Sequence, residues 1–255
     1  MSDIVTTTPV DLDAEMAEIS RRYQAASSPG LQVLNLLGGQ AEGLLDRLPG
    51  PVRNGLDGAT ERALLIALDA AQSSRRAVPD QAGWLNTAVA TAMGAAGGFG
   101  GMPSALVELP VTTTVLLRSI QGAASEQGFD PASENVRFDC LRVFGSAGPL
   151  AHDDGADLGF LSVRLTLTGG TMQKMIATVA PRLAGVLGQK LAAQTVPVLG
   201  AVAGAATNYA FTNYYQQMAH VHFRLRRLAV EADTPHEVLV AELAKRLNRP
   251  PPSGD

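Results

Sequence analysis

The chain has 255 residues, of which 46% are hydrophobic and only 17% are charged, and its formal net charge is −4. The charged share is well below the roughly 25% of an average soluble protein. Without a basic surplus the chain has little with which to neutralise a phosphate backbone, which argues against nucleic acid as its main partner. The single cysteine, Cys140, excludes an internal disulfide and fits a reducing compartment.

Residues 1–18 are acidic and lack a basic segment followed by an apolar one, so we expect no signal peptide and a cytoplasmic location. We expect a flexible lead and a first helix within residues 1–30, with the helix from Asp11 to Ala26, and a disordered tail at 248–255. Between these two ends, apolar residues have helical spacing in nearly every segment.

Within that part of the chain the apolar spacing never alternates as it does in strands, and no hairpin signal occurs. The sequence therefore predicts an all-α fold, a compact bundle of about eight to ten helices. Glycine-rich, closely packed links should join some of them, since five glycines cluster between residues 94 and 101. Beyond the first helix, the predicted helices span 31–48, 52–73, 80–95, 110–127, 130–144, 158–180, 181–194, 196–231 and 234–247.

Capping residues fix several of these boundaries. Pro110 suits the first turn of a helix, and Gly128 suits the position after its last turn. Asp130 followed by Pro131 suits the start of the next helix. Residues 234–237, Thr-Pro-His-Glu, have the pattern of a capping box that opens the last helix.

Two long stretches, 81–107 and 191–223, contain no aspartate, glutamate, lysine or arginine. Such stretches belong in a protein core, in a contact between helices, or at a membrane. Arg224, Arg226 and Arg227 close the second stretch. They are candidates for contact with a membrane or a partner, because arginines beside an apolar segment can bind anionic lipid headgroups. They also suit the C-terminal end of a helix.

A regular series of small and polar residues winds along the helix predicted at 196–231. One reading is a seam between helices of a soluble bundle, and the other is a polar groove or a hairpin that dips into a membrane. The sequence leaves both open. The series takes every fourth residue: Gly200, Gly204, Asn208, Thr212, Gln216, His220 and Arg224.

Glu108 is the one acid within a long apolar region. A buried carboxylate needs a partner, and Arg118 and Arg137 are candidates. The pair could be structural, or Glu108 could belong to a binding site. The candidate ligand-binding residues are Glu108, Arg118, Arg137, Asn208, Gln216, His220 and His222.

His220 and His222 stand two residues apart, so on a helix they point about 200° apart and cannot chelate one metal ion. The sequence also lacks the patterns GxxxxGK[ST], GxSxG, CxxC and HExxH. We therefore expect neither a metal ion nor a cofactor, and we assign no catalytic residue.

Three segments stand out in order and spacing: 97–128 with its Gly-Gly-Phe-Gly-Gly start, 196–208, and 220–228 with its His-Val-His-Phe start. Together they resemble the EcsC family of bacterial proteins, over about residues 31–247, which implies one EcsC-like helical domain in that range. An acidic residue often follows Arg-Arg-Leu in that family; here Ala229 follows Arg226-Arg227-Leu228, and the next acid is Glu231. The resemblance implies a helical protein that is cytoplasmic or membrane-associated, in a family named after a protein encoded beside an ABC transporter, and it supplies no catalytic residues.

Three functions follow as hypotheses. The first is a non-enzymatic accessory protein on the inner face of the cytoplasmic membrane, attached to the lipid surface or to a membrane protein. Attachment is favoured over a span because 196–211 is shorter than the ~20 residues needed to cross a bilayer. The second is a soluble carrier of an apolar, lipid-like small molecule, whose polar end the candidate ligand-binding residues would hold. The third is a hydrolase with Glu108 or His220 as general base, although no nucleophile accompanies them.

Overall fold

The computed structural model describes residues 10–36, 45–77, 101–146, 158–162, 172–194 and 200–248, and every regular element in these ranges is helical. Seven helices have 11 residues or more, slightly fewer than the eight to ten expected, and α6 is a single turn. The helix predicted at 80–95, the residues before 10 and most of the predicted tail lie outside these ranges. The elements are α1 (Leu12–Leu36), η1 (Leu45–Arg47), α2 (Gly50–Ala77), α4 (Gly101–Glu126), α5 (Glu134–Phe144), α6 (Gly159–Ser162), α7 (Met172–Gln194), α8 (Gly200–Glu231) and α9 (His236–Arg246).

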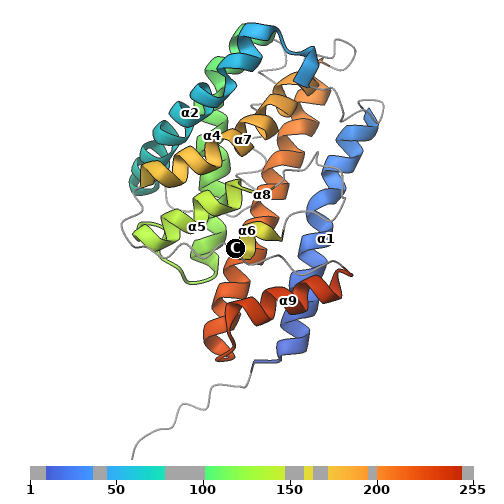
Figure 1. The fold of residues 1–255 in the computed structure, drawn as a ribbon, viewed down its shortest axis with the longest axis vertical. Helices are drawn as coiled ribbons and strands as arrows, with labels where there is room; N and C mark the ends of the chain where they lie inside the picture. The colour runs from blue at the N-terminus through green and yellow to red at the C-terminus, as the bar shows by residue number, and fades with distance from the viewer. Residues whose placement is uncertain are drawn as a thin grey trace, which may run out of the picture.

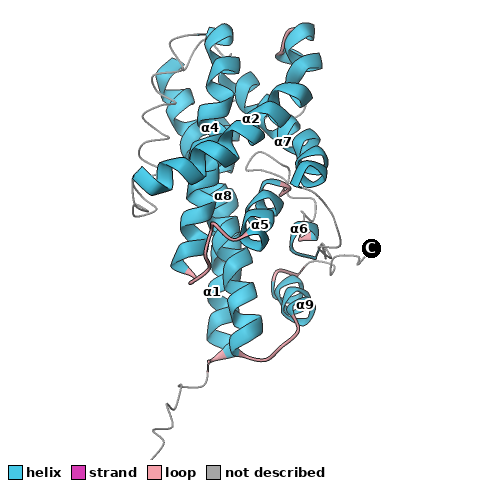
Figure 2. Cartoon of the chain, turned by 90° about the vertical axis from the view of Figure 1, so that its left-hand side faces the viewer, coloured by secondary structure: helices cyan, strands magenta, loops and turns pink. Residues whose placement is uncertain are grey.

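Helix α8 lies at the centre of the helical bundle (Figure 1). It packs against α1 along much of its length and against α4, with smaller contacts to α5, α7 and α9. Helices α2, α4 and α7 pack together toward one end of the molecule, and α9 crosses near the other end beside α6 (Figure 2). The described part of the second uncharged stretch is largely core, since most side chains from 207 to 223 are buried inside this assembly.

The core combines aliphatic side chains with a few large aromatic ones. Phe144 of α5 meets Tyr215 of α8 edge to face, with ring centroids 5.3 Å apart. Cys140, also on α5, is fully buried. On α7, Gly188 permits a close approach, because a Cβ atom there would lie 2.6 Å from Leu45 and 2.9 Å from Leu56. The all-α prediction is thus confirmed for the described residues.

Several predicted boundaries are wrong, and two of them share a cause. Pro110 lies inside α4, which begins at Gly101, and Pro181 lies inside α7. Proline in a helix interior removes one backbone hydrogen bond and crowds the preceding turn, and both helices continue through it. Around Pro110, Thr113 and Thr114 donate side-chain hydrogen bonds to the carbonyls of Leu109 and Pro110.

The predicted caps give a mixed result. Gly128 has φ +82°, so the prediction of a left-handed residue after α4 is confirmed. Asp130 accepts a hydrogen bond from the backbone of Ala132, but α5 starts only at Glu134. The capping box at 234–237 is wrong, because the Thr234 hydroxyl donates backward to the carbonyl of Ala232 and no side chain caps α9. Helix α1 continues past Ala26 and across the expected boundary at residue 30.

Candidate functional site on helix α8

Polar side chains project from two opposite sides of α8. His220 and Arg224 reach toward α4 and α1, whereas His222 and Arg226 reach toward α5. Residues two apart on a helix differ by about 200° in direction, and residues four apart lie on one face. The spacing in the sequence therefore separates these four residues into two groups.

The first group, which we call the histidine cluster, contains Asp139 and Arg142 of α5, His222 and Arg226 of α8, and His236 of α9. His222 Nε2 lies 3.2 Å from Asp139 Oδ1, and Arg226 donates to Asp139 Oδ2. Arg142 lies 3.6 Å from the same carboxylate. One buried carboxylate thus receives contacts from two guanidiniums and an imidazole.

Aromatic rings enclose the histidine cluster. The Arg226 guanidinium lies over the ring of Phe129, 4.7 Å from its centroid, and the His222 ring meets Phe223 edge to face. His236 has its Nε2 3.2 Å from the carbonyl oxygen of Leu161, which links α9 to α6. The His222 side chain has 0% of its surface exposed, so it cannot reach a reactant in this conformation.

The charge states in the histidine cluster follow from burial and from the arginines. Burial alone would raise the pKa of Asp139, but His222, Arg226 and Arg142 together hold that pKa below its usual value. Burial lowers the pKa of His222, and it also lowers the pKa of His236. At neutral pH the cluster therefore contains an ionised aspartate and neutral histidines, an arrangement that joins α5, α8 and α9.

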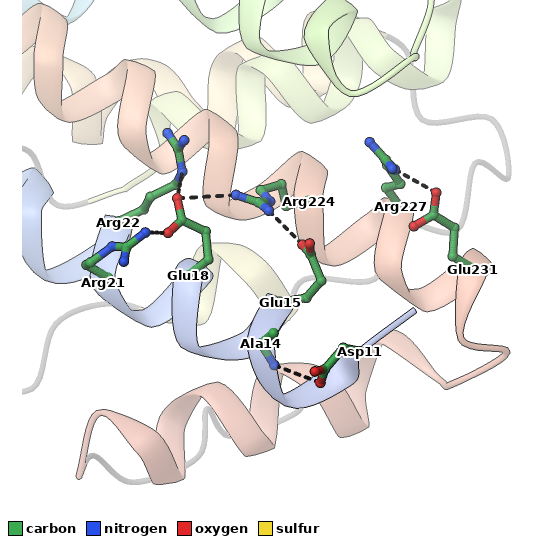
Figure 3. A network of polar contacts seen from close by, with 9 residues as sticks. All are labelled: Asp11, Ala14, Glu15, Glu18, Arg21, Arg22, Arg224, Arg227 and Glu231. Carbon is green, nitrogen blue, oxygen red and sulfur yellow. Dashed lines mark hydrogen bonds and ion pairs between the residues drawn. The ribbon is translucent and has the colours of Figure 1, made fainter. Parts of the chain in front are cut away.

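The second group lies where α1 crosses α8 (Figure 3). Arg224 donates to Glu15 Oε2 at 2.7 Å and lies 3.4 Å from Glu18 Oε1. Glu18 also receives contacts from Arg21 and Arg22 of its own helix. A turn further along α8, Arg227 donates through Nε to Glu231 Oε1 at 2.7 Å.

Between these ion pairs the surface forms a hollow of about 290 Å³, which we call the charged cleft. Two arginines and two glutamates line it, together with one amide and one leucine side chain. The lining residues are Glu15, Gln127, Arg224, Arg227, Leu228 and Glu231.

His220 lies on the same side of α8 as Arg224, next to the end of α4. Its Nε2 is 3.6 Å from Glu126 Oε2 at the end of α4, and its side chain is 7% exposed. Burial, assisted by the positive charges of Arg22 and Arg224, lowers its pKa to about 4. His220 is therefore neutral at pH 7 and is a weak proton acceptor there.

The remaining predicted residues lie on α4, α5 and α8. Arg118 and Arg137 are half-buried on α4 and α5. Asn208 is buried and Gln216 half-buried on α8; Asn208 stands about 18 Å from His220 along the helix, at about 1.5 Å per residue. Glu108 lies on α4, but its side chain is outside the described part. The structure therefore brings together His220 with Arg224, and His222 with Arg226.

Two buried charged residues were not among the predicted site residues. Asp139 centres the histidine cluster, and Lys190 of α7 is 2% exposed, with its Nζ 3.2 Å from the Thr112 hydroxyl. The signal that singled out Glu108, a charge within a long uncharged region, also points to Lys190, which borders the stretch 191–223. It does not point to Asp139, because Arg137 and Arg142 lie two and three residues away.

The described residues include no group of three histidine, cysteine, aspartate or glutamate side chains placed to hold a metal ion. In the same ranges, no helix combines the length and the apolar character needed to cross a membrane.

Comparison with known proteins gave one match. The model of the EcsC protein family matches residues 71–228, a range that includes α4, α5, α7 and most of α8. Neither curated proteins nor solved structures gave a significant match. The matched range contains the basic half of the charged cleft and, apart from His236, all of the histidine cluster.

Proposed function

Because the chain belongs to the EcsC family, we propose that it is a non-enzymatic helical accessory protein that acts at or near the cytoplasmic membrane, linked to an ABC transporter. The observation that carries this proposal is the uncharged stretch 81–107, which runs into the first turns of α4. Most side chains in the later part of the second uncharged stretch, from 207 to 223, are buried in the protein core. The first stretch is therefore the better candidate for contact with lipid or with an apolar partner.

The charged side chains support a non-enzymatic role. His222 is fully buried, and the pKa of about 4 makes His220 a poor base at neutral pH. Arg224, Arg226 and Arg227 each pair with a carboxylate of the same chain. These ion pairs stabilise the helix packing.

The test is fractionation of the untagged protein from cells, followed by a salt wash and an alkaline wash of the membranes. We expect the protein to sediment with membranes, resist salt and leave on alkaline treatment, as a peripheral protein held by apolar contact does. A protein that stays in the supernatant throughout would overturn the proposal.

A pair of variants tests whether the stretch 81–107 makes the membrane contact. Val89→Glu places a charge inside the stretch 81–107, and we expect it to release the protein into the soluble fraction. Ile66→Glu is the matched control, because Ile66 is an apolar side chain of α2 that is already 52% exposed. Circular dichroism of both variants verifies that they remain folded. Equal behaviour of the two folded variants would contradict a role for 81–107.

A soluble carrier of an apolar small molecule is the alternative function. Mass spectrometry of protein purified without detergent tests it, since a carrier should retain a lipid-like molecule at a stoichiometric level. An empty protein that also remains soluble in cells would speak against both proposals.

A further inference from the structure

The charged cleft offers both signs of charge to one small volume. Arg224 and Arg227 stand three residues apart on α8, so their guanidiniums share one face of the helix. Glu15 approaches from α1, and Glu231 follows one turn after Arg227. In Figure 3 the pair Arg224–Glu15 and the pair Arg227–Glu231 flank the same gap.

The ion pairs leave parts of Arg227, Glu15 and Glu231 open to a ligand. Arg224 donates one N–H to Glu15 and faces Glu18 with its other terminal nitrogen, so a ligand would meet only its remaining N–H groups. Among the contacts of the described residues, Arg227 uses only its Nε, so both of its terminal nitrogens can donate elsewhere. Glu15 contacts Arg224 through Oε2, and Glu231 contacts Arg227 through Oε1, which leaves one oxygen of each carboxylate as an acceptor. The side chains of Arg227 and Glu231 are 50% and 37% exposed, so solvent reaches them.

The balance of charges decides which ligands suit the cleft. A simple anion would gain from the two arginines but would be repelled by the two glutamates, and a simple cation would meet the reverse. A molecule that carries both charges satisfies all four side chains. A tetrahedral phosphate presents three oxygens that can accept from two guanidiniums approaching in different planes, whereas a carboxylate presents only two oxygens in one plane.

We propose that the charged cleft binds a small zwitterion composed of a phosphate ester and a primary amine. The phosphate lies between Arg224 and Arg227, and the amine donates to Glu15 and Glu231. The match to the family model ends at residue 228, so the phosphate-binding half lies within the matched range and the amine-binding half lies outside it. This inference does not depend on membrane attachment.

Isothermal titration of the full chain with O-phosphoethanolamine tests the proposal. We expect binding at least about tenfold tighter than that of inorganic phosphate, of ethanolamine, or of β-alanine at the same ionic strength. β-Alanine keeps the amine and the two-carbon spacing but carries a carboxylate. The proposal would be overturned if O-phosphoethanolamine did not bind, or if it bound no more tightly than inorganic phosphate. Equal affinity for β-alanine would also overturn it, because the cleft would then not distinguish a phosphate from a carboxylate.

Three variants locate the ligand. Arg227→Gln should weaken O-phosphoethanolamine binding at least about tenfold, and Glu231→Gln should weaken it while strengthening the binding of inorganic phosphate. A merely structural role of Glu231 would not produce that reversal. Arg53→Gln is the control, because Arg53 is also about half exposed (48%) and pairs with Asp46 at 2.7 Å far from the cleft. Unchanged affinity in both cleft variants would overturn the assignment.

The same chemistry occurs as a free metabolite and as a lipid headgroup, and vesicles distinguish the two. Sedimentation with phosphatidylcholine vesicles, with and without phosphatidylethanolamine, is compared in the presence of free O-phosphoethanolamine. Binding that requires phosphatidylethanolamine and is displaced by the free compound identifies the headgroup. Titration with the free compound but no vesicle binding identifies a soluble ligand. If the protein does not sediment with cell membranes but does bind O-phosphoethanolamine in the titration, only the proposed function is overturned.

Discussion

His220 shows how a single side chain couples this fold to pH. Its folded-state pKa of about 4 lies below the usual value of 6.5, since the imidazole is buried beside Arg22 and Arg224. The unfolded chain therefore binds a proton that the folded chain rejects between pH 6.5 and 4. Stability is retained above pH 6.5 and falls as the pH drops through that window.

Replacement of His220 by glutamine should flatten this dependence. The wild-type free energy of unfolding should fall between pH 7 and pH 4.5, and His220 should contribute about 3 kcal/mol of that loss at about 1.4 kcal/mol per pH unit. Urea denaturation at both pH values measures the difference. Asp139, whose pKa is held below its usual value, acts only at lower pH and does not interfere. An equal loss in wild type and variant would contradict a buried neutral His220.

Asp139 is the residue on which the histidine cluster depends. Asp139→Asn removes the charge that faces Arg226, Arg142 and His222, and we expect it to cost about 3–5 kcal/mol, as removal of one partner from a buried ion pair does. The matched control is Asp46→Asn, which breaks the exposed pair with Arg53 and should cost about 1 kcal/mol or less. Chemical denaturation of both variants decides the matter, and similar losses would show that the cluster is not a structural centre.

At the scale of single helices, two glycines of α7 provide a matched test of packing. Gly188→Ala would place a Cβ atom 2.6 Å from Leu45 and 2.9 Å from Leu56, so α7 must move or the leucines must shift. We expect a loss of about 1–3 kcal/mol.

Gly185→Ala on the same helix is the control, since a Cβ atom there meets nothing within 4 Å. It should stabilise the protein by up to about 1 kcal/mol, because alanine favours a helix more than glycine does. Urea denaturation of the two variants should therefore shift the midpoint in opposite directions. Shifts of the same sign would mean that α7 does not approach η1 and α2 as closely as described.

The helices also show where prediction from sequence succeeds and where it stops. Apolar spacing was enough to predict the all-α class and the existence of most helices. It failed at Pro110 and Pro181, where the local preference of proline favours a helix start but the helix continues through the proline. It also failed at Thr234, whose hydroxyl turned back to a carbonyl rather than capping α9.

The site was harder to predict because its contacts are distant in the chain. Helical geometry alone placed His220 and His222 on opposite sides of α8. The partners could not be inferred, since Arg224 and Glu15 are 209 positions apart and Arg226 and Asp139 are 87 apart. Periodicity indicates which face a side chain takes, but not which helix covers that face.

At the scale of the whole molecule, α1 is integral to the fold although it precedes the range matched by the family. Among the described helices, no other pair packs as extensively as α1 and α8. Met16, Ile19 and Ala26 of α1 are fully buried, and Tyr23 is 7% exposed. A chain without residues 1–36 would expose the face of α8 that these side chains cover.

We expect that truncated chain to lose cooperative unfolding, because several large apolar side chains each contribute about 1.5–3 kcal/mol when buried. Urea denaturation followed by circular dichroism measures the steepness of the transition. A chain that lacks only residues 1–9 serves as the control and should unfold as the intact chain does. The same midpoint and steepness in all three chains would show that α8 needs no cover from α1.

The burial of Cys140 has a practical consequence. A thiol reagent modifies only a thiolate that solvent can reach, and the chain contains no second cysteine to confuse the signal. The rate of labelling under native conditions therefore reports how often α5 opens. Since Cys140 is adjacent to Asp139, its labelling rate also measures how often the histidine cluster opens. No cysteine has to be introduced by mutation for this measurement.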